Sequence, residues 1–148
     1  MRKALFFLPL ALLAGTASAQ FRVPLLAPRQ PPAPVLTGID ALRADFQAKS
    51  GTDTVYFGAD NAQLGPPARA VLQAQALWLL QHPEVVVRIE GHGEVADTRD
   101  HALAMGAKRA EEVRTALVLM GVPAAQLTTM SWGKERPGAP RAVTVLVR

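Results

Sequence analysis

The sequence predicts an α+β domain in which two helices pack on one face of a small mixed sheet, preceded by a short N-terminal helix. Three observations predict this class. Strand-like and helix-like segments alternate in the order β-α-β-α-β-β after the first helix. Removing a predicted leader, residues 1–19, from the 148-residue chain leaves 129 residues, enough for one hydrophobic core and not for two. No internal repeat is present.

The leader has the pattern of a cleaved signal peptide. Two basic residues precede an apolar stretch, residues 4–15, that is too short for a bilayer span, and residues 17–19 form a small-x-small site. We therefore expect cleavage after Ala19 and export, with an uncleaved anchor as the alternative. The chain has no Cys, so we expect neither lipid attachment at a Cys nor disulfides.

Composition also limits the partners. The leader carries two of the four net positive charges, so the mature chain has a formal charge of +2. No basic stripe is interleaved with aromatic residues, and nucleic acid is not an expected partner. Residues 20–35 hold five prolines and predict an extended linker or a disordered N-terminus, which leaves residues 36–148 for the domain.

The first half of the domain follows from spacing and from its Pro and Gly residues. A short amphipathic helix ending near Gly51 is indicated by apolar residues at helical spacing, namely Leu36, Ile39, Leu42 and Phe46. Residues 52–57 are rich in β-branched and aromatic residues and predict a strand. A helix over 68–81, following Pro66 and Pro67 and stopped by Pro83, has the predicted inner face Leu72, Ala76 and Leu79.

The second half contains the longest element. Residues 85–90 are apolar on both faces and predict a central strand. A helix over 98–120 is capped by Asp97 or Thr98 and followed by Gly121; its predicted buried stripe is Leu103, Gly106, Ala110, Val113 and Leu117. Strands over 127–131 and 142–147 are joined by a turn-rich connection.

Five motifs carry a family resemblance. In order they are VYFGAD (55–60), IEGH (89–92), GAKRAEEVRTAL (106–117), GVPAAQL (121–127) and WGKERP (132–137). Together they resemble the OmpA-like C-terminal domain family, and within it the branch of the peptidoglycan-associated lipoproteins. The resemblance implies non-covalent peptidoglycan binding in the periplasm of a two-membrane bacterium. Because no Ser, Cys or Lys has a plausible base partner, no enzymatic activity is expected.

The resemblance also implies a site. Glu94 and Arg109 fall where the family's Asp and Arg hold the diaminopimelate of the stem peptide, and Asp60 falls on a further family acid. Two other positions are included as candidates, Asp97 where the family has Gly, and Arg141, the survivor of an Asn-Arg-Arg trio. The family's Tyr-Asn pair is His101-Ala102 here.

Other interpretations stay open at this point. Arg109 is also placed to form a surface ion pair with Glu111 or Glu112. A His-x-Glu-x-x-Asp-x-x-x-His pattern over residues 92–101 matches no closed zinc motif, so neither metal nor cofactor is expected, and His92 is expected to be hydrogen-bonded. A degenerate domain that contacts envelope proteins is the alternative function. We expect a periplasmic protein, peripheral to the outer membrane or wall, without stable membrane insertion.

Overall fold

The computed structural model describes residues 38–147. The predicted signal peptide and the Pro-rich linker therefore lie outside the described residues. In chain order the elements are α1 (Ile39–Ser50), β1 (Thr54–Tyr56), α2 (Pro66–Gln81), β2 (Val87–His92), α3 (Arg99–Leu119), the 3₁₀ turn η1 (Ala124–Gln126), β3 (Leu127–Gly133) and β4 (Arg141–Leu146). The predicted order is confirmed, with η1 as the one addition.

The four strands form one mixed sheet in the order β1-β4-β2-β3. β2 runs parallel to β3 and antiparallel to β4, and β1 pairs antiparallel with β4. The predicted central position of β2 is confirmed. β2 begins two residues later and ends two residues later than the predicted strand over 85–90, because Gly91 and His92 pair with both neighbouring strands.

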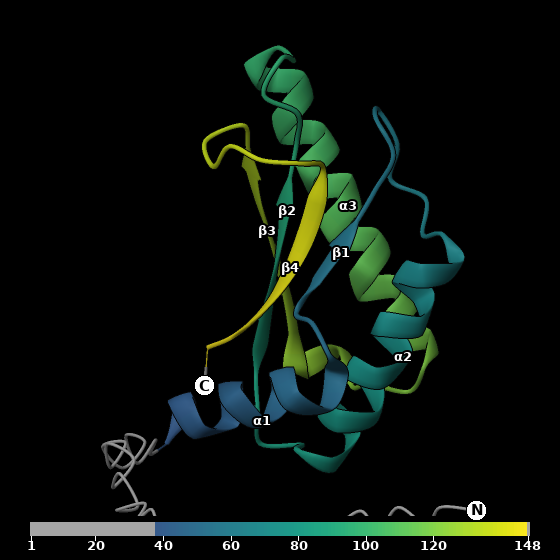
Figure 1. The fold of residues 1–148 in the computed structure, drawn as a ribbon, viewed down its shortest axis with the longest axis vertical. Coiled ribbons are helices and arrows are strands. Elements are labelled where there is room, and N and C mark those ends of the chain that lie inside the picture. Colours follow the sequence, from purple (N-terminus) through teal and green to yellow (C-terminus); the bar gives the residue numbers. More distant parts are fainter. Residues whose placement is uncertain (1–37, 148) are drawn as a thin grey trace, which may run out of the picture. The chain divides into compact units, whose positions relative to one another are not determined.

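The helices α2 and α3 cover one face of this sheet, and α3 runs along its length (Figure 1). Residues of β4 alternate accordingly, with Ala142, Thr144 and Leu146 buried and the intervening residues partly exposed. α1 packs against α2 through Phe46, whose ring meets Trp78 edge-on at 5.1 Å between centroids. None of the helices within residues 38–147 has the length and apolar character needed to cross a membrane.

Two glycines bring α3 into direct contact with the sheet. A Cβ atom on Gly91 would lie 1.8 Å from the carbonyl oxygen of Gly106, and one on Gly106 would lie 2.4 Å from Ser131 Oγ. The backbones of β2 and α3 therefore touch, which only residues without side chains allow. The contact sets the position of Arg109, one turn further along α3, relative to the end of β2.

The predicted buried stripe of α3 is correct except at its first residue. Gly106, Ala110, Val113 and Leu117 are buried, whereas Leu103 is 50% exposed. Ala102, one residue earlier, takes the buried position instead and is fully covered. A side chain one residue away on a helix is rotated by about 100°, which carries Leu103 off the sheet-facing side.

Candidate functional site

The loop between β2 and α3 is held at both ends. Thr98 caps α3, its Oγ1 accepting the N–H of His101 at 3.3 Å, so Thr98 rather than Asp97 is the cap. Lys134 Nζ donates to the main-chain oxygen of Asp97 at 2.7 Å. Gly93 has no room for a side chain, because a Cβ there would lie 2.4 Å from the Ala102 carbonyl oxygen. The acids on this loop are therefore held at defined places.

Arg109 is the organising side chain of the site. It is fully buried, and its guanidinium donates to three main-chain oxygens: His92 O at 2.8 Å, Asn61 O at 2.8 Å and Gly58 O at 3.1 Å. The guanidinium carbon also lies 5.7 Å from the centre of the Phe57 ring. Arg109 thus joins the loop that follows β1 to the end of β2.

Glu94 completes the coordination of this guanidinium. Its Oε1 accepts Arg109 Nη2 at 3.2 Å and the main-chain N–H of Asp60 at 2.5 Å. These two donors, first the Asp60 amide and then Arg109, lower the pKa of the Glu94 carboxyl. The structure therefore brings together the acid and the Arg that the sequence paired, and Arg109 pairs with neither Glu111 nor Glu112.

A second charged cluster lies beside the first. His101 Nδ1 is hydrogen-bonded to Asp97 Oδ2, and His101 Nε2 lies 3.4 Å from Asp60 Oδ1. The bond to His101 is the main cause that lowers the pKa of Asp97. Asp60 adopts a left-handed backbone, φ 46°, which Asp tolerates better than most residues. The sequence marked His101 as a departure from the family pattern and as the last residue of a pattern that matches no closed zinc motif, and did not predict its position between two carboxylates.

Arg141 is the one candidate residue that does not join the others. It lies on β4 opposite His92 and Tyr56, and its Nη1 donates to the Ala139 carbonyl of its own loop at 3.2 Å. Among the described residues it forms no hydrogen bond with the other four candidates. The structure thus groups Glu94, Arg109, Asp60 and Asp97 without Arg141.

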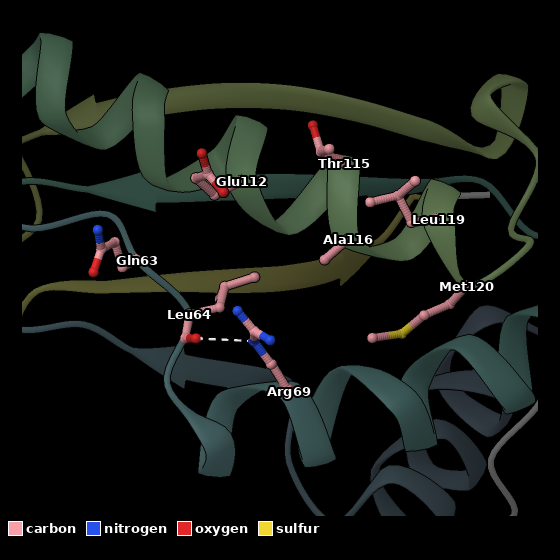
Figure 2. Close-up of a pocket in the computed structure, with 8 residues that line it drawn as sticks. All are labelled: Gln63, Leu64, Arg69, Glu112, Thr115, Ala116, Leu119 and Met120. Carbon is pink, nitrogen blue, oxygen red and sulfur yellow. Dashed lines mark hydrogen bonds between the residues drawn. The ribbon is translucent and has the colours of Figure 1, made fainter.

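The Arg109 guanidinium lies beneath the surface of the site. Three carbonyls and one carboxylate surround Arg109 and leave it no exposed surface. No sequence signal marks this, because any residue supplies a carbonyl. A cavity of about 610 Å³ lies elsewhere (Figure 2), and its lining is Gln63, Leu64, Arg69, Glu112, Thr115, Ala116, Leu119 and Met120.

The expectation that the His92 side chain is hydrogen-bonded is not met at its Nδ1 atom. The imidazole is buried, and its Nδ1 has no hydrogen-bond partner in the described structure. Burial first, and then the nearby charge of Arg141, lower the pKa of His92 from 6.5 to about 4, so the ring is neutral at pH 7. Within residues 38–147 no three His, Cys, Asp or Glu side chains are grouped to hold a metal ion.

Comparison with known proteins relates this arrangement to one family. A profile of the OmpA family matches residues 56–145. A protein of Agrobacterium fabrum named peptidoglycan-associated lipoprotein is 39% identical over 113 residues, covering 69% of this chain and 63% of the relative. One of the same name from Pseudomonas aeruginosa is 40% identical over 101 residues, covering 68% and 60%. The chain thus matches less than two thirds of each of these relatives.

Solved structures agree on the fold. The peptidoglycan-associated lipoprotein from Burkholderia pseudomallei is 36% identical, with a TM-score of 0.63 over 66% of this chain and 92% of that chain. The periplasmic domain of Helicobacter pylori MotB has a TM-score of 0.54 over 62% of this chain and 72% of its own. At 21% identity the second likeness concerns the fold alone.

Proposed function

Because this chain belongs to the OmpA family, we propose that it binds peptidoglycan non-covalently in the cell envelope, at the site formed by Glu94, Arg109, Asp60 and Asp97. The names of its relatives support this choice of ligand. The observation that carries the proposal is the contact of Glu94 with Arg109 at the end of β2. It is a binding function, and none of its steps needs a cofactor or a catalytic group.

The ligand group that suits the site is the diaminopimelate of the stem peptide, because its side chain ends in an amine and a carboxylate. The carboxylate is suited to Arg109, and the amine to the acids around it. Asp60 is the most accessible of these, with a side chain 72% exposed, and Asp97 is 25% exposed. The rim therefore presents negative charge to solvent, while the positive charge lies beneath it.

The energies of such contacts predict modest affinity at one site. A sheltered charge-assisted hydrogen bond contributes about 1.5–3 kcal/mol, and an exposed ion pair about 0–1 kcal/mol. The wall offers many identical stem peptides, so a released molecule meets another site nearby. A weak single site is therefore compatible with stable residence on the wall. On this proposal the protein is exported, its leader is removed after Ala19, and it works in the periplasm beside the wall.

One observation favours the alternative function, a domain that contacts envelope proteins. Arg109 is buried and four of its N–H groups are already used. An Arg in this state serves the fold whether or not a ligand arrives. The alternative predicts a domain that is fully folded and does not bind the wall.

Sedimentation with purified sacculi separates the two functions. The test variant is the double substitution Asp60→Asn and Asp97→Asn, which removes two rim charges and keeps the side-chain shapes. The matched control is Asp100→Asn, an exposed acid in the first turn of α3. We expect wild type and control to pellet and the double variant to move toward the supernatant. Wild type that stays in the supernatant at every sacculus concentration rejects the proposal.

A further inference from the structure

One oxygen atom of Glu94 occupies the centre of the site. Oε1 receives both the Arg109 guanidinium and the Asp60 amide, while Oε2 has no hydrogen bond within the described residues. A guanidinium N–H and a main-chain N–H that converge on one point form an anion site. In this structure the anion in that site is the protein's own carboxylate.

The frame of the site does not depend on Glu94. The bonds from Arg109 to the carbonyls of His92, Asn61 and Gly58 do not involve Glu94, and they hold both the guanidinium and the loop after β1. The Glu94 side chain is 28% exposed and has solvent on one side. Glu94 is thus the one partner of Arg109 that can rotate away without unfolding main chain.

Departure of Glu94 leaves a buried positive charge without a counter-charge. An unpaired charge in the interior is strongly unfavourable, and a neutral group does not offset it. A ligand therefore has to supply a negative group of its own to the two donors that Glu94 releases. A ligand lacking a carboxylate has nothing to exchange for Glu94.

We propose that Glu94 is a built-in competitor that sets the specificity of the site. Only a ligand carrying its own carboxylate displaces the Glu94 carboxylate from Arg109 and the Asp60 amide. The displaced Glu94 then joins Asp60 and Asp97 around the ligand's amine. This inference rests on the proposed function for the identity of the ligand. It adds that a stem peptide whose diaminopimelate carboxyl is amidated does not bind at this site.

Calorimetric titration of the full chain tests the exchange. The ligands are the stem tripeptide ending in diaminopimelate, with the diaminopimelate side-chain carboxyl as its one free carboxyl, and the same tripeptide with that carboxyl amidated as well. The variants are Glu94→Asp, which keeps the charge on a shorter side chain, and Val95→Ala, an exposed neighbour, as control. We expect wild type and Val95→Ala to bind the acid and not the amide. We expect Glu94→Asp to bind the acid about fivefold more tightly, the equivalent of one partly exposed ion pair.

Hydrogen exchange of the Asp60 amide tests the closed state without any ligand. Asp60 is exposed, so its amide is protected only through the bond to Glu94. We expect protection in wild type and Val95→Ala, and its loss in Glu94→Asp and Glu94→Ala. Equal exchange in all four proteins overturns the inference.

The titration and the hydrogen exchange together distinguish failure of the inference from failure of the proposed function. Wild type that binds acid and amide alike overturns the inference and leaves the proposed function standing. If the Glu94→Asp variant binds the acid no more tightly than wild type, the inference is likewise overturned and the proposed function still stands. Failure of wild type and variants to bind either tripeptide rejects the proposed function, and the exchange of the Asp60 amide then decides on its own whether Glu94 closes the site.

Discussion

Arg109 of α3 donates a hydrogen bond to the main-chain carbonyl of His92, the last residue of β2, at 2.8 Å between buried atoms. This bond fastens the long helix to the central strand at the place where the site begins. Arg109 also holds the loop after β1 through Gly58 and Asn61. A residue predicted as a ligand contact is therefore a structural element too, which affects how its variants are to be interpreted.

Arg109→Ala should lower the free energy of unfolding by about 3–5 kcal/mol, because it leaves the buried His92 carbonyl, two partly buried carbonyls and Glu94 without their partner. Urea unfolding followed by circular dichroism measures it. Arg114→Ala, on the same helix in an ion pair with Glu111, is the control and should change stability by less than about 1 kcal/mol. Equal effects of the two variants would contradict the structural role. Loss of binding in Arg109→Ala can be interpreted only together with this stability measurement, because an unfolded variant would also fail to bind.

Gly91→Ala should destabilise the domain by about 3 kcal/mol or more, because its Cβ would overlap the Gly106 carbonyl of α3. Chemical denaturation gives the value. Ala107→Gly, at an exposed position one residue beyond Gly106, should cost only about 1 kcal/mol through helix propensity. A stable Gly91→Ala protein would mean that β2 and α3 lie further apart than described.

Glu90 should stabilise the sheet through two arginines. Its Oε1 accepts Arg88 Nε and Nη2 at 2.9 and 2.7 Å, its Oε2 accepts Arg136 Nη1 at 2.9 Å, and Arg136 stacks over Trp132. Glu90→Gln should lower the free energy of unfolding by about 1–3 kcal/mol, since bonds to a buried charge are lost. Glu111→Gln, in an exposed pair, should change it by less than about 1 kcal/mol. An unaffected melting curve for Glu90→Gln would count against the cluster.

Stability should fall as the pH is lowered from 6.5 toward 4, because His92 resists protonation in the fold. The pKa of His92 is lowered from 6.5 to about 4, so between these values the unfolded chain binds a proton that the folded chain does not. The contribution is complete above pH 6.5 and decreases by up to about 3 kcal/mol on the way down.

Unfolding curves between pH 5 and 7 isolate this effect, because the lowered pKa values of Glu94 and Asp97 affect stability only below their ordinary values of 4.5 and 3.8. His92→Phe keeps a ring and removes the titrating group. Its stability should be nearly flat across this interval. If the free energy of unfolding of His92→Phe changed with pH as steeply as that of wild type, another group would be responsible for the pH dependence.

The fold could be predicted from the sequence because its periodicities are local. The three- and four-residue spacing of Gly106, Ala110 and Val113 marks the buried face of α3, and the apolar run before Gly91 marks the central strand. Leu103 was misplaced because its position one residue from Ala102 also satisfies an i, i+3 spacing. The ends of β2 and β3 depend on pairing between strands, which spacing along the chain does not reveal.

The site was predicted only in part. The resemblance selected Glu94 and Arg109, and these residues do meet. The burial of Arg109 was not predicted, because its partners are carbonyls of Gly58 and Asn61, 51 and 48 residues earlier in the chain. Carbonyl acceptors have no side-chain identity and leave no motif. Arg141 was included because of the family resemblance, and its place on β4 separates it from the rest.

The measurement that tests the central claim most directly is amide chemical-shift mapping of the full chain with the diaminopimelate stem tripeptide. It locates the ligand without any substitution that could disturb the fold. We expect the shifts to concentrate at residues 58–61 and 93–97, around the Glu94 carboxylate. Shifts confined to Leu119, Met120 and their neighbours at the large cavity, or no shifts at saturating peptide, would contradict it.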